Sequence, residues 1–210
     1  MAKETEQGLG TPLRFEADPE TKRKKGAYRP VFADVFTLPG ASPAKVEKVH
    51  LLVNPFAGKK QGRAVAAQVV ELVERAGIEI TVSYSAYSGH LVTMASALEV
   101  GDHDIIAVVG GDGSLSEAIT GRMLLNGKRT ETFAIVPAGT GNSQAHDLRL
   151  GTPEEAVEAM LNGRRQALDL ARVELTEGLP GSTGEVIVRY SHNLVTWGLG
   201  VDSTIQAEKM

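Results

Sequence analysis

Short apolar runs alternate with segments of helical spacing between residues 46 and 162. The run "DIIAVVGG" (104–111) has the continuous apolar character of a strand that is buried on both faces of a sheet. The segment 61–77 repeats its apolar residues every three or four positions and ends in a glycine, as an amphipathic helix does. Because about four strands and helices alternate in this way, the sequence predicts an α/β fold with a parallel, doubly wound sheet.

The boundaries of the other elements follow from the same patterns. We expect further strands at the end of 46–55, at 78–85 and at 132–137, and further helices at 89–100, 114–127, 141–148 and 152–163. The last helix has the clearest start, because Thr152 is a good N-cap, Pro153 suits the first helical position and Glu155 completes a capping box.

Three regions are predicted from shifts in composition. Residues 1–45 are rich in glycine, proline and charge, and form a partly disordered N-terminal extension in which 28–38 could add an edge strand. Residues 46–165 form the α/β nucleotide-binding domain. Residues 166–210 contain two strand-like stretches joined by "TEGLPGSTG", which indicates the beginning of a second, antiparallel β lobe that is incomplete at Met210.

The overall composition excludes several functional classes. The net charge of -4 argues against a nucleic-acid binder, and the absence of cysteine excludes disulfides and thiolate metal sites. The chain has no apolar run of the roughly 18 residues that a membrane span requires. We therefore expect a cytoplasmic protein, with any membrane contact peripheral.

Three glycine-bearing turns follow three of the expected strands: "NPFAGKKQG", "GGDGS" and "PAGTGN". The carboxyl ends of parallel strands share one edge of the sheet, where open α/β folds bind ligands. Glycines let the main chain approach a phosphate, and the helix that follows each turn offers free N–H groups. Neither the Rossmann pattern nor a Walker loop fits these turns. The sequence therefore predicts a nucleotide site with another kind of phosphate grip.

Together these motifs resemble the catalytic domain of the diacylglycerol kinase, sphingosine kinase and ceramide kinase family. "NPFAGK", "GGDGSLSEAITG" and "PAGTGN" are similar to N-P-x-[SA]-G-K, G-G-D-G-[TSL]-x-x-E and P-x-G-[TS]-G-N in that family. "SAYSGHL" resembles a looser element, [TS]-x-x-x-G-H-A, and "TWGLGVDSTIQAEKM" resembles the entry to the second lobe. The likeness extends from about Lys48 to Met210.

The resemblance implies an ATP-dependent lipid kinase that uses Mg²⁺ and transfers the γ-phosphoryl group to the hydroxyl of a sphingoid or diacylglycerol-type lipid. Asp112 would be the catalytic base, or would help to place Mg²⁺, and Asp202 would face the lipid. The nucleotide site would be lined by Asn54, Gly58, Lys59, Ser85, Gly110, Gly111, Gly113, Ser114, Glu117, Gly139, Thr140, Gly141 and Asn142.

Some of these residues also have structural interpretations. Ser114 and Glu117 have the spacing of a capping box, so Glu117 could cap a helix as well as contact nucleotide. Asp112 could form a turn, although three glycines around it already supply one, which favours chemistry. The five histidines have no metal-ligand spacing, and we interpret them as structural or surface residues, with His90 as the one neighbour of the site.

Two departures from the family pattern bear on function. Thr204 occupies a position where sphingosine kinases often carry an acid that meets the amine, which favours ceramide, diacylglycerol or another acylated lipid alcohol. The early end of the chain raises the alternative of a non-catalytic nucleotide-binding module or an inactive fragment. An NAD kinase is disfavoured, because "PAGTGN" stands where that family has an Asn-Glu or Asn-Asp pair.

Overall fold

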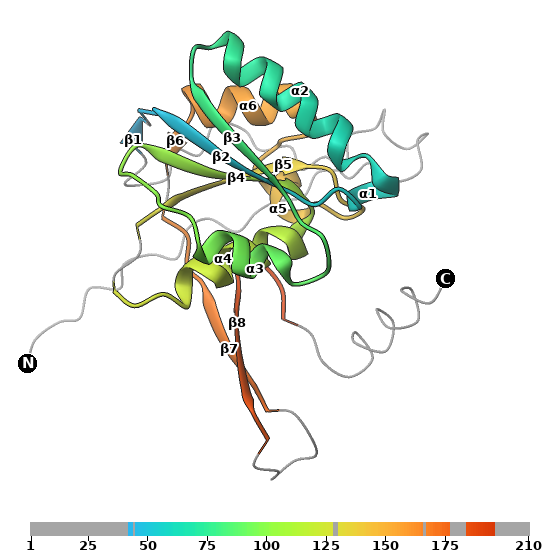
Figure 1. Cartoon of the computed structure of the whole chain (residues 1–210), viewed down its shortest axis with the longest axis vertical. Helices are drawn as coiled ribbons and strands as arrows, with labels where there is room; N and C mark the ends of the chain where they lie inside the picture. Colours follow the sequence, from blue (N-terminus) through green and yellow to red (C-terminus); the bar gives the residue numbers. More distant parts are fainter. Residues whose placement is uncertain (1–41, 44, 128–129, 166, 177–183, 196–210) are drawn as a thin grey trace, which may run out of the picture. The chain divides into compact units, whose positions relative to one another are not determined.

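The structure is a computed structural model, and it describes residues 42–43, 45–127, 130–165, 167–176 and 184–195, all within the unit Gly40–Met210. The central sheet contains four parallel strands: β2 (Lys48–Val53), β3 (Glu79–Tyr84), β4 (Asp104–Gly110) and β5 (Thr132–Pro137). Their order is β3-β2-β4-β5, so the chain moves outward from β2 to β3 and then returns to β4 on the other side. The predicted parallel sheet is confirmed, and its switch point lies between β2 and β4 (Figure 1).

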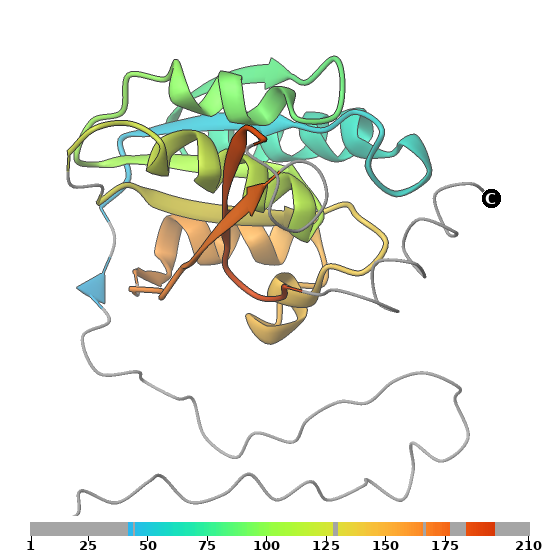
Figure 2. The same ribbon diagram turned by 90° about the horizontal axis from the view of Figure 1, so that it is seen from below.

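Helices cover both faces of this sheet, as a doubly wound fold requires. They are α1 (Ala57–Lys60), α2 (Gly62–Arg75), α3 (His90–Ser96), α4 (Asp112–Met123), α5 (Ser143–Asp147) and α6 (Pro153–Asn162). The α2 and α6 helices lie on one face, and α3, α4 and α5 supply the core residues of the other face (Figures 1 and 2). In β2, Leu51 packs toward α2 and α6, whereas Leu52 packs toward α3 and α4, as the alternation of side chains along a strand dictates.

The helix boundaries agree with the sequence patterns except in α3, at both ends of α4, which stops at Met123 rather than near residue 127, and in α1. The capping box of α6 is confirmed, with Glu155 N donating to Thr152 Oγ1 at 3.1 Å and Glu155 Oε2 accepting from Thr152 N at 3.1 Å. The α3 helix ends at Ser96 rather than near residue 100, because the chain turns away where Arg122 binds the carbonyls of Ala95 and Leu98. The α4 helix begins two residues before its expected start, and α1 is a short irregular turn that the pattern did not predict.

The second region begins with an antiparallel hairpin of β7 (Ala171–Thr176) and β8 (Val186–Ser191), as predicted. The hairpin contacts α4, where Tyr190 N donates to Thr120 Oγ1 at 3.0 Å (Figure 1). A second antiparallel pairing was not expected: β1 (Ser42–Pro43) pairs with β6 (Arg164–Arg165). The predicted edge strand at 28–38 lies outside the described residues.

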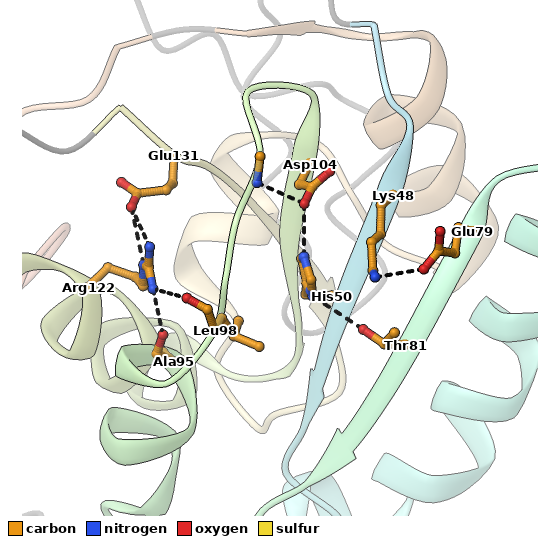
Figure 3. Close-up of polar contacts among 10 residues, drawn as sticks. Lys48, His50, Glu79, Thr81, Ala95, Leu98, Asp104, Arg122 and Glu131 are labelled. Carbon is orange, nitrogen blue, oxygen red and sulfur yellow. Dashed lines mark hydrogen bonds and ion pairs between the residues drawn. The ribbon is translucent and has the colours of Figure 1, made fainter.

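Two buried polar side chains, His50 and Arg122, lie at the amino edge of the sheet, away from the glycine turns (Figure 3). His50 Nε2 lies 3.0 Å from Asp104 Oδ2, and His50 Nδ1 lies 3.2 Å from Thr81 Oγ1. Burial alone would raise the pKa of Asp104, but hydrogen bonds from Gly101 N and His50, together with nearby positive charge, lower the pKa below its usual value. These contacts satisfy the polar groups on β2 and β4 and tie the two central strands together.

Arg122 forms the second polar cluster of that edge (Figure 3). Its guanidinium is almost fully buried, pairs with Glu131 at 2.7 Å and donates to the carbonyls of Ala95 and Leu98. It therefore binds two carbonyls at and just after the end of α3, one of which, Ala95 O, also accepts from Leu98 N at 3.2 Å. Among the helices of the described segments, none has both the length and the apolar character needed to cross a membrane.

Candidate nucleotide-binding and catalytic site

The three glycine turns meet at the carboxyl edge of the sheet, as the sequence predicted. The strand register brings the ends of β4 and β5 together, with Gly110 opposite Pro137. Gly110 O accepts from Ala138 N at 2.9 Å and from Gly139 N at 3.2 Å. On the other side of β4, Asn54 N donates to Val109 O at 2.9 Å, which holds the turn after β2 against it. The three turns are therefore joined through the main chain of β4.

Close contact between these turns explains why several of their residues are glycine. A Cβ atom on Gly139 would lie 2.6 Å from Gly111 Cα, and one on Gly58 would lie 2.1 Å from Ala138 O. Both distances are far shorter than a van der Waals contact. Gly58 also has a φ of 43°, which disfavours a side chain further. These glycines allow one turn to pack on another, a role that the sequence analysis did not assign to them.

Two other glycines face open space. A Cβ atom on Gly113 would have no neighbour within 4 Å, and one on Gly141 would have only Asp112 Oδ2, at 3.8 Å. Both belong to the turns that surround Asp112. The space beside them is the part of this edge that a phosphate group could occupy without displacing protein atoms.

Asp112 is the first residue of α4 and points toward the start of α5. Its Oδ2 accepts from Ser143 N and its Oδ1 accepts from Gln144 N, both at 2.8 Å. The carboxylate thus binds free N–H groups at the amino end of α5, whose own N-cap residue forms no side-chain cap. A carboxylate has about four lone-pair positions, so each oxygen retains an acceptor position after these two bonds. The two donors orient the carboxylate and leave each oxygen able to accept one further hydrogen bond.

The two asparagines of the turns brace the loops to which they belong. Asn142 has a φ of 54°, and its amide donates to Gly139 O at 2.8 Å and accepts from Gly139 N at 2.9 Å. Asn54 Oδ1 accepts from Phe56 N at 3.0 Å, and Asn54 Nδ2 donates to Ser114 Oγ at 3.2 Å. Each side chain closes its own turn, and Asn54 also links its turn to the start of α4.

The capping-box interpretation of Ser114 and Glu117 is wrong. Since α4 begins at Asp112 with Gly111 as its N-cap, Ser114 lies at the third helical position and is buried under Asn54. Glu117 Oε1 instead accepts from Gly89 N at 3.0 Å, which ties α4 to the loop before α3. The helix starts early because Gly111 is extended and its carbonyl already accepts from Leu115 N, at 3.2 Å.

The remaining predicted residues differ in their surroundings. Ser85 is buried, and its N–H donates to Val53 O at 2.8 Å. Lys59 and Thr140 are exposed, and Lys59 has a left-handed backbone with a φ of 53°. Asp202 lies outside the described residues. The residues predicted to line a nucleotide site therefore lie along one edge of the sheet, and among them Ser85 and Ser114 are buried.

The described site offers Mg²⁺ a limited donor set. Within the described segments, no group of three or more histidine, cysteine, aspartate or glutamate side chains could hold a metal ion. Asp112 is the carboxylate at the centre of the glycine turns. Mg²⁺ commonly binds through one or two carboxylates together with phosphate oxygens and water, so this donor set fits a metal ion that arrives with a nucleotide.

Sequence reasoning missed one residue that the structure brings to the site. His192 follows β8 and was interpreted as structural or surface, but it is only 8% exposed. Its Nδ1 lies 3.0 Å from Gln144 Oε1 and its Nε2 lies 3.3 Å from Asp112 O. No motif contains His192, and the 80 positions that separate it from Asp112 hide the contact from any local pattern.

The chain is similar to known proteins over much of its length. Residues 48–173 match the family described as the diacylglycerol kinase catalytic domain. Sphingosine kinase 1 of Arabidopsis thaliana is 30% identical over 190 residues, which cover 86% of this chain and 37% of that protein. Diacylglycerol kinase of Bacillus subtilis is 27% identical over 132 residues, which cover 61% of this chain and 42% of that protein. A solved diacylglycerol kinase from Bacillus anthracis str. Sterne is 26% identical, with a TM-score of 0.49, and covers 62% of this chain and 46% of its own.

The chain belongs to the family of the diacylglycerol kinase catalytic domain. It spans less than half the length of each relative described above.

Proposed function

We propose that this chain provides the nucleotide-binding half of an ATP-dependent lipid kinase, with Asp112 as the base. The observation that carries the proposal is the placement of one oriented carboxylate between open glycines: both oxygens of Asp112 are held at 2.8 Å by the main chain of α5, and Gly113 and Gly141 leave space beside it. Phosphoryl transfer requires mainly positioning and charge neutralisation, together with one group near the attacking hydroxyl.

The proposed reaction is a direct transfer. The lipid hydroxyl oxygen bonds to the γ-phosphorus of ATP, the bond from that phosphorus to the β–γ bridging oxygen breaks, and ADP leaves. The hydroxyl proton passes to the free acceptor position of the Asp112 carboxylate. Mg²⁺, when bound, would neutralise phosphate charge, and Asp112 is the described residue that could hold it in place of serving as the base.

A pocket beside the glycine turns supports a lipid as the acceptor. It has a volume of about 300 Å³ and lies between α4 and the β7–β8 hairpin. Gly113 and Glu117 line one side, while Val173, Leu175 and Leu194 line the other. The apolar side chains share this lining with Glu117 and Arg189, and the pocket begins one residue from the proposed base, which suits an acyl or alkyl chain whose polar head must reach Asp112. We propose diacylglycerol, ceramide or another acylated lipid alcohol as the substrate class.

The test is transfer of radiolabelled phosphate from Mg-ATP to sphingosine, ceramide and diacylglycerol, comparing the wild-type chain with Asp112→Asn. We expect transfer to one of these lipids and a loss of about 10²–10⁴-fold in the variant, because general-base catalysis contributes that much. Asp147→Asn is the matched control, since Asp147 is an exposed aspartate at the end of α5. The control should retain wild-type transfer.

Two further measurements separate chemistry from structural damage. An asparagine at position 112 would turn an NH₂ group toward Ser143 N or Gln144 N, so the free energy of unfolding and the Kd for ATP are measured for each variant. Lost transfer with an unchanged Kd supports the base. Wild-type binding of ATP without transfer to any lipid would instead support the alternative, a non-catalytic nucleotide-binding module.

A further inference from the structure

His192 stands out among the buried polar residues because it comes from the hairpin and contacts the turn that carries Asp112. It lies directly after β8, and its exposed fraction is 8%. Burying an imidazole has a free-energy cost unless its nitrogens find partners. Both nitrogens do so here: Nδ1 meets the side chain of Gln144, and Nε2 meets the main-chain carbonyl of Asp112.

These contacts complete a closed circuit of hydrogen bonds through three residues. Asp112 Oδ1 accepts from Gln144 N at 2.8 Å. Gln144 Oε1 lies 3.0 Å from His192 Nδ1, and His192 Nε2 lies 3.3 Å from Asp112 O. The circuit therefore holds Asp112 at both its carboxylate and its carbonyl, and it draws on α4, α5 and the residue after β8.

The circuit does not require one protonation state of the imidazole. A neutral ring can donate from Nε2 to Asp112 O while its Nδ1 accepts from the NH₂ group of Gln144, and a charged ring can donate from both nitrogens to two oxygens. Rotation of the Gln144 amide by half a turn exchanges the two arrangements. The Gln144 side chain can therefore donate to or accept from the ring while its main-chain N–H stays bound to Asp112.

We propose that His192 is a positioning residue for the reaction, which sets the orientation of Asp112 through its main chain and through Gln144. The inference rests on the proposed function of Asp112 and adds that the second region contributes to the site before any lipid binds. A displacement of about 1 Å in a catalytic group can reduce a rate by about 10²-fold, so a residue that fixes the turn has an effect on chemistry without touching substrate.

Three substitutions separate positioning from simple packing. His192→Ala removes both contacts. His192→Gln retains a donor at about the reach of Nε2 and so can restore the bond to Asp112 O, whereas the shorter His192→Asn can reach only Gln144. His146→Ala is the matched control, because His146 is an exposed histidine on α5, the helix that carries Gln144.

The first readout needs no activity. Hydrogen–deuterium exchange is measured in the full chain for the amides of Ser143 and Gln144, which donate to Asp112. We expect exchange to be faster by about two- to tenfold in His192→Ala and His192→Asn, the range that follows from losing one net hydrogen bond. Exchange should remain near the wild-type rate in His192→Gln and in His146→Ala.

The second readout measures the effects of the substitutions on kcat and on KM separately. We expect His192→Ala to reduce kcat for phosphate transfer by about tenfold or more and to leave the KM for ATP within about twofold, with His192→Gln recovering most of the rate. If His192→Ala lowered the rate only by destabilising the fold, His192→Gln would not be expected to restore it. If His192→Ala does not fold, the comparison of His192→Gln with His192→Asn carries the test, since both are polar side chains.

Two outcomes would overturn the inference. One is equal exchange of the Ser143 and Gln144 amides in wild type, His192→Ala and His192→Asn. The other is a rate loss that His192→Gln and His192→Asn share equally. Failure of the proposed function is a separate result, in which the wild type transfers phosphate to no lipid, and the exchange measurement then still decides whether His192 holds Asp112.

Discussion

Gly113→Ala should affect folding and nucleotide binding in opposite directions. Gly113 is the second residue of α4, and a Cβ atom there would have no neighbour within 4 Å. An alanine in a helix is more stable than a glycine by about 0.5–1 kcal/mol, so the free energy of unfolding should rise by that amount. For a chain of this size, such a gain raises Tm by about 1–4 °C. Gly139→Ala should instead lower the free energy of unfolding, because its Cβ atom would lie 2.6 Å from Gly111 Cα.

The same methyl group should weaken ATP binding. If phosphate occupies the space beside Gly113, the added atom overpacks the bound state at a cost of about 1–3 kcal/mol, or roughly 5- to 150-fold in Kd. Calorimetric titration with ATP and urea denaturation measure the two effects on the same sample. Gly101→Ala is the control, since its Cβ atom would lie at an ordinary 3.5 Å from Asp104 at the opposite edge of the sheet. A stabilised Gly113→Ala variant that binds ATP with the wild-type Kd would refute the placement of phosphate there.

Two further predictions concern the amino edge of the sheet. Arg122→Met should lower the free energy of unfolding by about 1–3 kcal/mol in urea denaturation, because it removes the bonds of the buried guanidinium to Glu131 and to the carbonyls of Ala95 and Leu98; an unchanged midpoint would contradict this. The pKa of Asp104 is lowered in the fold, since hydrogen bonds from Gly101 and His50 outweigh the effect of burial, so its contribution to stability is present above about pH 4 and is lost as pH falls further. Asp104→Asn should therefore flatten the loss of stability between about pH 5 and pH 2, and a variant with the wild-type pH profile would argue against that assignment.

Periodicity alone was sufficient to predict the sheet and its helices. The continuous apolar runs of β2 and β4 and the helical spacing of α2 report burial directly, and the Thr152 capping box marks the start of α6 at Pro153. The edge that carries the glycine turns could also be predicted, because all parallel strands end on the same side. These features depend on neighbours in sequence or on the direction of the chain.

The contacts within the site could not be predicted in the same way. Asp112 binds main-chain donors 31 and 32 positions away, and main-chain groups leave no trace in side-chain patterns. Ser114 and Glu117 have the spacing of a capping box by coincidence, because Gly111 allows α4 to begin two residues earlier. Gly58 and Gly139 were attributed to ligand approach, whereas their nearest neighbours are the other turns.

The pairing of β1 with β6 has a consequence for how the α/β domain is attached to the rest of the chain. Ser42 lies opposite Arg165 and Pro43 opposite Arg164, so the strand that enters the domain and the strand that leaves it run side by side. Residues 42–165 therefore enter and leave the fold at one place. A segment with adjacent ends can be circularly permuted by joining them without threading the chain across its sheet, but this would give up the contacts that the β7–β8 hairpin makes with α4.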